Sequence, residues 1–292
     1  MYFRLGQEAT IGQNSRLLLS DGTIYWYGNY DDAIRPTGSF DPELPVIAFK
    51  SEDQKLEAVL FNHSTHTIGA RQKGVLSPVF YGLAVQELEK EYGGNFLFLL
   101  GAHGSTHDLP WTRSADEKVF RIKEAVKDAL LKAEKREIPR LVSVKKEFEY
   151  RVRHFDPEEE EKAVTYYCTK RLTDPEKNIE FFRKMRTDLI PHQGELRKTW
   201  LQVMVIGDVA IVGISGELFS DLGIDIKRRS PFRYTYIADC ANDQIGYLPD
   251  RKGFELGGYQ LWSGRNSHVA KGTGEKLVDE ALNLLRDIYE SK

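Results

Sequence analysis

The segment from residue 56 to residue 101 limits most narrowly the folds open to this chain. It begins with the apolar run LEAVLF, continues after Ser77-Pro78 with apolar residues at helical spacing, and ends with the apolar run NFLFLLG. Gly93 and Gly94 separate the expected helix from the second run. Strand, helix and strand in this order predict a βαβ unit, whose two strands run parallel in a sheet that helices cover.

Other segments predict hairpins, so we expect a mixed sheet. Residues 199–217 contain two apolar runs on either side of an Ile-Gly-Asp turn, which indicates an antiparallel pair. Apolar residues at helical spacing predict amphipathic helices at 114–135 and 274–289. No internal repeat is visible in the sequence. We therefore expect an α/β fold with flanking helices, formed by one domain over residues 1–292, with a charged, helical insertion or lid at about 112–195.

The charge balance and the apolar runs exclude some classes of protein. The chain has 41 basic and 44 acidic residues and a net charge of −3, so it lacks the positive field that nucleic-acid binding needs. It has no run of 18 apolar residues that would predict a membrane span. The first residues lack the pattern of a secretory signal, and Cys168 and Cys240 form no CxxC pair. These features predict a cytoplasmic protein.

Four histidines and one acid follow predicted strands, where side chains of different strands can meet. They are His63, His66, His103, His107 and Glu217. Because neighbouring strand ends lie at one edge of a sheet, these side chains could share one crevice. Imidazole and carboxylate groups are ligands that Zn²⁺ prefers. The alternative is that they are polar residues on the wall of a cleft, hydrogen-bonded within the protein.

A later segment adds phenol groups to the same region. A strand predicted at 234–240 leads to Tyr247 and then to a glycine-rich loop at 253–259. The loop has two interpretations. It is either a surface turn between sheet and helix, or a loop that lets Tyr259 and Trp262 lean over a substrate.

Five segments, in the same order along the chain, resemble the neutral (non-lysosomal) ceramidases and their bacterial relatives of unassigned substrate. They are NSRLLLSDG, FNHSTHTIG, FLFLLGAHGSTHD, GDVAIVGISGELF and ANDQIGYLPDRKGFELGGY. The resemblance covers most of the chain outside roughly 112–195. It implies an α/β catalytic domain that holds one zinc ion and hydrolyses the amide bond of N-acylated sphingoid bases.

Carried over position by position, the resemblance implies His66, Glu217 and Tyr247 as zinc ligands. It implies that Tyr259 is the phenol that donates to the carbonyl oxygen of the substrate, where it would stabilise developing negative charge. We expect the substrate to be a small or lipid-like N-acyl compound, cleaved by water that the zinc ion activates.

Five further residues receive roles in this hypothesis. His107 or His63 is the candidate proton donor for the leaving amine. His103 or His107 could also complete the metal site beside His66 and Glu217. The candidate substrate-binding residues are His103, Gly258 and Trp262.

Two differences from the ceramidase pattern keep other functions open. The first zinc ligand of the family lies in a His-x-His segment, which this sequence does not contain. The Gly-Asp-x-Ser-Pro pattern of ceramidases corresponds here to residues 104–108, GSTHD. Besides the zinc-dependent amide hydrolase, we therefore consider a catalytically inactive remnant or binding module. A third possibility is one subunit of a split enzyme, whose partner chain carries the His-x-His half, and a homo-oligomer is a further alternative.

Overall fold

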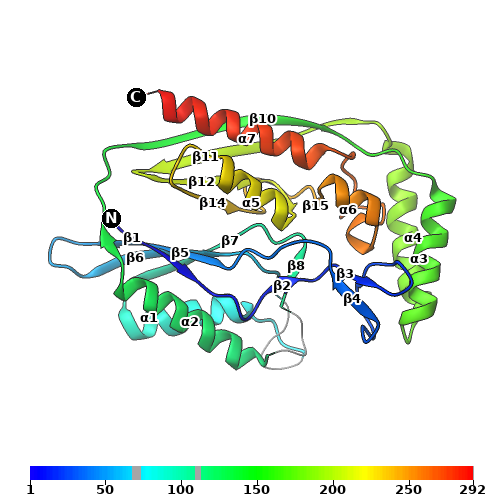
Figure 1. The fold of residues 1–292 in the computed structure, drawn as a ribbon, viewed down its shortest axis with the longest axis horizontal. Helices are drawn as coiled ribbons and strands as arrows, with labels where there is room; N and C mark the ends of the chain where they lie inside the picture. Colours follow the sequence, from blue (N-terminus) through cyan, green and yellow to red (C-terminus); the bar gives the residue numbers. More distant parts are fainter. Residues whose placement is uncertain (68–73, 109–112, 292) are drawn as a thin grey trace.

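The computed structural model describes residues 1–67, 74–108 and 113–291. Two sheets pack face to face and helices cover the outer face of each sheet, which gives four layers (Figure 1). The strand order is β7-β6-β5-β1-β9 in the first sheet and β10-β11-β12-β14 in the second. The expected mixed α/β class is confirmed.

The first sheet contains the predicted βαβ unit. Strand β6 (Leu56–His63) leads through helix α1 (Val79–Tyr92) to β7 (Asn95–Leu100), and β7 runs parallel to β6. The other strands are β5 (Glu43–Lys50), β1 (Tyr2–Gln7) and β9 (Glu134–Lys135), each antiparallel to its neighbour. Helices α1 and α2 (Ala115–Leu131) bury their apolar stripes on one face of this sheet.

The second sheet repeats the connectivity of the first. Strands β10 (Leu141–Arg151), β11 (Leu196–Ile206) and β12 (Val209–Ile214) are antiparallel neighbours. Helix α5 (Ser220–Arg229) then leads to β14 (Tyr234–Ala238), which is parallel to β12. The final helix, α7 (Thr273–Glu290), packs beside α5 on the outer face. The order β10, β11, β12, α5, β14, α7 in the second sheet thus matches the order β1, β5, β6, α1, β7, α2 in the first. This repeat is not visible in the sequence, because a topology needs only similar polarity patterns and not similar residues.

Apolar side chains of both sheets form the layer between them. Phe3 and Ile47 from the first sheet belong to one buried cluster with Ile211 and Tyr236 from the second. At one edge, the Asn62 side-chain amide donates to the carbonyl oxygens of Leu99 in β7 and Ile237 in β14, at 2.8 Å each. The carboxyl ends of the two parallel strand pairs therefore lie together.

The region at about 112–195 is distributed over several parts of the fold, and its first residue lies outside the described part of the chain. Helix α2 covers the first sheet and β10 is an edge strand of the second. Helices α3 (Pro157–Arg171) and α4 (Pro175–Leu189) pack together at one end of the molecule (Figure 1). Within the described ranges, no helix is both long and apolar enough to cross a lipid bilayer.

Candidate metal centre

Two imidazoles and one carboxylate converge where strands of both sheets end. His66 follows β6, His103 follows β7, and Glu217 follows β12. Their ligand atoms all lie within 4.8 Å of one another. Nε2 of His66 is 3.0 Å from Oε2 of Glu217, and Nε2 of His103 is 3.9 Å from the same oxygen. Glu217 belongs to a two-residue strand, β13 (Glu217–Leu218), and helix α5 begins shortly after it at Ser220.

The hydrogen bonds at Nδ1 fix how both imidazoles face this cluster. Nδ1 of His66 lies 2.9 Å from the carbonyl oxygens of His103 and Thr106. Because carbonyl oxygens only accept, Nδ1 carries a proton, and Nε2 is the ring nitrogen that faces Glu217. Nδ1 of His103 is 2.9 Å from Oδ2 of Asp239, and burial lowers the pKa of His103. Both rings therefore present Nε2 to the cluster.

Asp239 was not recognised in the sequence, although it directly follows the strand β14. It is fully buried, and burial raises its pKa well above the usual range. Its Oδ2 accepts from the backbone N–H groups of His103 and Leu218 at 3.1 and 2.9 Å, in addition to the His103 ring. A carboxylate behind an imidazole is the usual partner that orients a metal-binding histidine. Its position within three residues of a strand end, which it shares with His66, His103 and Glu217, is the signal that could have identified it.

Glu217 is held from its other side as well. Its Oε1 accepts from Nε2 of Gln244 at 3.0 Å, and its backbone N–H donates to the carbonyl of Gly246 at 2.9 Å. Burial would raise the pKa of Glu217, but the hydrogen bond and the charges of His66 and His103 outweigh burial and lower it. Gln244 is a second residue that the sequence did not identify. The Glu217 carboxylate is thus ionised and fixed at both oxygens.

Two phenols lie beside the carboxylate. Tyr247 begins the strand β15 (Tyr247–Leu248), which pairs in parallel with Glu217–Leu218. Its hydroxyl is hydrogen-bonded with Glu217 and lies 3.2 Å from the hydroxyl of Tyr259. Burial is the main cause that raises the pKa of both phenols, so both keep their protons at neutral pH.

A buried arginine supports the loop that carries Tyr259. Arg16, 2% exposed, donates to Oε1 of Gln260 at 2.7 Å and to the carbonyl of Gly257 at 2.6 Å. Burial lowers its pKa to about 10. Gly258 has φ +95°, and a Cβ there would lie 2.8 Å from Cβ of Ile24. Glycine is therefore required at this position for the backbone to pass.

His107 and Trp262 lie in different surroundings. The His107 ring stacks on His66 with ring centroids 5.6 Å apart, and its Nδ1 is 3.0 Å from Oδ1 of Asp108. Trp262 is 7% exposed and packs edge-on against Trp26 and Phe182.

His63 is turned away from the cluster. It has no exposed surface, and its two ring nitrogens lie 2.5 Å from the Tyr81 hydroxyl and 2.9 Å from the carbonyl oxygen of Glu8. The structure therefore brings His66, His103, Glu217, Tyr247, Tyr259 and His107 into one region, but it does not bring His63 there.

The donor set fits a zinc ion. Two imidazoles and one carboxylate are a set that catalytic zinc sites use, with a further position left for water or substrate. Nε2 of His66 and Oε2 of Glu217 lie 3.0 Å apart, so a cation bound at this point could take both atoms as ligands. The His66 and Glu217 side chains are 19% and 15% exposed, against 4% for His103, so the cluster is open on their side.

Comparison with known proteins supports the fold. No family model matches this sequence, and no curated protein matches it. A ceramidase complexed with C2 superposes with a TM-score of 0.69 at 14% identity, over 99% of this chain and 53% of the other. Neutral ceramidase from Pseudomonas aeruginosa superposes with a TM-score of 0.67 at 16% identity, over 98% of this chain and 52% of the other. The chain has the ceramidase fold and spans about half the length of these proteins.

Proposed function

We propose that this chain is a zinc-dependent hydrolase that cleaves the amide bond of an N-acyl compound. The observation that carries the proposal is the convergence of His66, His103 and Glu217, with both imidazoles held at Nδ1 so that Nε2 is presented. The similarity of the fold to two ceramidase structures supports an amide as the bond that is cleaved.

In this proposal His66, His103 and Glu217 hold the zinc ion, and Tyr247 is placed to be a fourth donor. Zinc supplies a Lewis acid that polarises a carbonyl group and activates water near neutral pH. Asp239 keeps the His103 proton on Nδ1 and so keeps Nε2 available. Of the two roles considered for His103, the proposal takes metal binding and not substrate binding, and no His-x-His segment is needed to bring two histidines together.

Tyr259 and His107 are the residues proposed to act on the substrate. The buried Tyr259 phenol keeps its proton and can donate to the carbonyl oxygen as negative charge develops there. His107, stacked on His66, is the candidate proton donor to the leaving amine. His63 receives no role, because both of its ring nitrogens already have partners inside the protein.

The metal content of the purified protein tests this proposal. Elemental mass spectrometry is expected to find about one zinc per chain in the wild type. The replacements His66→Ala, His103→Ala and Glu217→Ala should each abolish binding. The exposed His154 provides the matched control, and His154→Ala should retain the metal.

Hydrolysis of N-acyl amides by the zinc-loaded protein is then measured by release of the free amine. A wild type that takes up no zinc after equilibration with it would contradict the proposal and favour a remnant or binding module. Zinc binding without amide cleavage would favour a metal-dependent protein of another class.

A further inference from the structure

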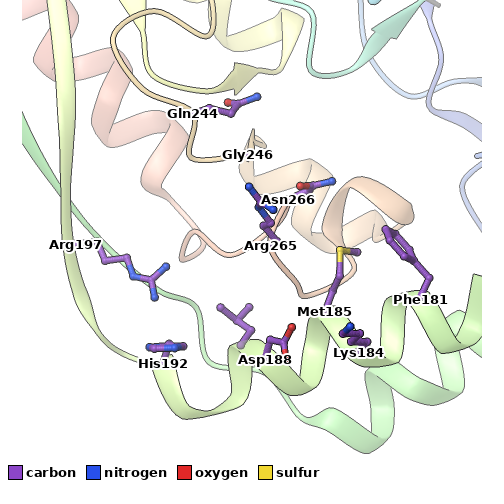
Figure 2. Close-up of a pocket in the computed structure, with 11 residues that line it drawn as sticks. Phe181, Lys184, Met185, Asp188, His192, Arg197, Gln244, Gly246, Arg265 and Asn266 are labelled. Carbon is purple, nitrogen blue, oxygen red and sulfur yellow. The ribbon is translucent and has the colours of Figure 1, made fainter.

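A cavity of about 780 Å³ shares a wall with the candidate metal centre. It lies between the carboxyl-terminal half of α4, the following turn η1 (Ile190–His192) and the chain around residues 244–246 and 265–266 (Figure 2). Gln244 lines the cavity and donates to Oε1 of Glu217 at 3.0 Å. Asn266 also lines it, and its carbonyl oxygen accepts from the Tyr247 backbone N–H at 2.9 Å. A molecule bound in this cavity would therefore touch residues that position Glu217 and Tyr247.

The cavity is lined by more positive than negative charge. Lys184, Arg197 and Arg265 contribute cations and Asp188 contributes one anion. Arg197 is paired with Glu195 at 2.8 Å. For Lys184 and Arg265, both exposed, the described residues provide no ion-pair partner within 4.0 Å. Two cations thus remain available to a ligand.

The wall contributed by α4 is partly apolar. Phe181 and Met185 lie along it (Figure 2), together with Leu189. The Phe181 side chain is 56% exposed. An apolar wall beside unpaired cations suits a molecule that has both a hydrocarbon part and an anionic group.

We propose that this cavity selects N-acyl substrates that carry a carboxylate, as N-acyl amino acids do. This inference rests on the proposed function and names its substrate class. Arg265 binds the carboxylate, because a guanidinium group matches its two oxygens, and Lys184 adds positive charge. Arg265 directly precedes Asn266, whose carbonyl oxygen accepts from the Tyr247 backbone N–H, so the Arg265 backbone lies close to the candidate centre.

The test compares two substrates that differ in one charge. N-lauroylglycine carries the carboxylate, and N-lauroylglycinamide replaces it with a neutral amide of similar size. For the zinc-loaded full chain, we expect kcat/KM to favour N-lauroylglycine about tenfold, as charge-assisted hydrogen bonds at a partly exposed site allow. Arg265→Gln should remove most of this preference, and Asp188→Asn should increase it. Arg228→Gln is the matched control, since Arg228 is an exposed cation that does not line the cavity.

A binding measurement separates this inference from the proposed function. Equilibrium dialysis with the same zinc-loaded variants measures the affinity for both compounds whether or not they are cleaved. Cleavage of both with equal kcat/KM, unchanged in Arg265→Gln, would overturn the inference while the proposed function stands. Binding that prefers the carboxylate and depends on Arg265, without any cleavage, would support the cavity assignment and contradict the proposed hydrolase. Equal binding of both compounds without cleavage would overturn both.

Discussion

Replacing Asp239 with asparagine is expected to weaken zinc binding while the fold is kept. The Asp239 carboxylate oxygen accepts three hydrogen bonds, from the His103 ring, the His103 backbone and the Leu218 backbone. The amide oxygen of asparagine can accept the same three. Burial opposes the negative charge of Asp239, whereas these hydrogen bonds to Oδ2 favour it, and asparagine cannot supply the charge that makes the His103 imidazole a stronger ligand.

The structure sets the size of the expected effect. Partners that orient a ligating histidine typically contribute about 10- to 100-fold to metal affinity. Because Asp239→Asn keeps the acceptor, we expect the lower end, about tenfold, which corresponds to about 1.4 kcal/mol. Asp239→Ala removes the acceptor as well and leaves two buried backbone N–H groups without it. The zinc affinity of Asp239→Ala should therefore fall about 100-fold, which corresponds to about 2.8 kcal/mol.

Competition between the protein and a chromophoric chelator for zinc measures both affinities. Asp21→Asn is the control, since the Asp21 carboxylate accepts from the Thr23 backbone N–H at 3.0 Å and pairs with Lys170 at 2.7 Å, and neither partner belongs to the candidate centre. Circular dichroism verifies that each variant is folded. If folded Asp239→Asn and Asp239→Ala both bind zinc within twofold of the wild type, Asp239 does not support the metal centre and the reasoning fails.

Two other predictions concern single side chains. Tyr259→Phe removes the hydroxyl but keeps the ring, whose centroid lies 5.5 Å from that of Trp26. The kcat for amide hydrolysis should therefore fall about 10²- to 10³-fold while the zinc content is unchanged. Loss of zinc in this variant would show instead that the hydroxyl supports the metal. Burial lowers the pKa of His63 below its usual value of 6.5. As the pH falls, the unfolded chain is therefore protonated at His63 before the folded protein is. The folded protein loses stability from this residue below pH 6.5 and not above it. The free energy of unfolding in urea should therefore fall less between pH 7.5 and 5.5 for His63→Gln than for the wild type. Equal decreases would refute the conclusion that burial lowers the pKa of His63.

Polarity patterns were sufficient to predict the main secondary structure. The apolar runs at 56–61 and 95–100 and the glycine pair between them predicted the parallel strands of the βαβ unit, although β7 is an edge strand in which Leu97 is 51% exposed. Strand ends also indicated where His66, His103 and Glu217 would meet, since loops at the carboxyl ends of parallel strands share one edge.

Contacts between distant segments could not be predicted in this way. Asp239 lies 136 residues after His103, and Arg16 lies 244 residues before Gln260. No local pattern links residues at such separations, because the contact exists only after the two sheets have packed. His63 shows a second limit. It is the last residue of β6 and points toward Tyr81, whereas His66 follows the strand and points toward Glu217, so a spacing of three residues did not place them together.

The two sheets contribute equally to the candidate centre. His66 and His103 follow strands of the first sheet, and Glu217 and Asp239 follow strands of the second, at corresponding places in the repeated topology. An ion bound there would cross-link the two halves of the molecule. Metal binding and the docking of the sheets are then linked equilibria, in which the free energy of binding adds to the free energy that holds the halves together. Substitutions in the apolar layer between the sheets, far from any ligand, would change metal affinity through this linkage.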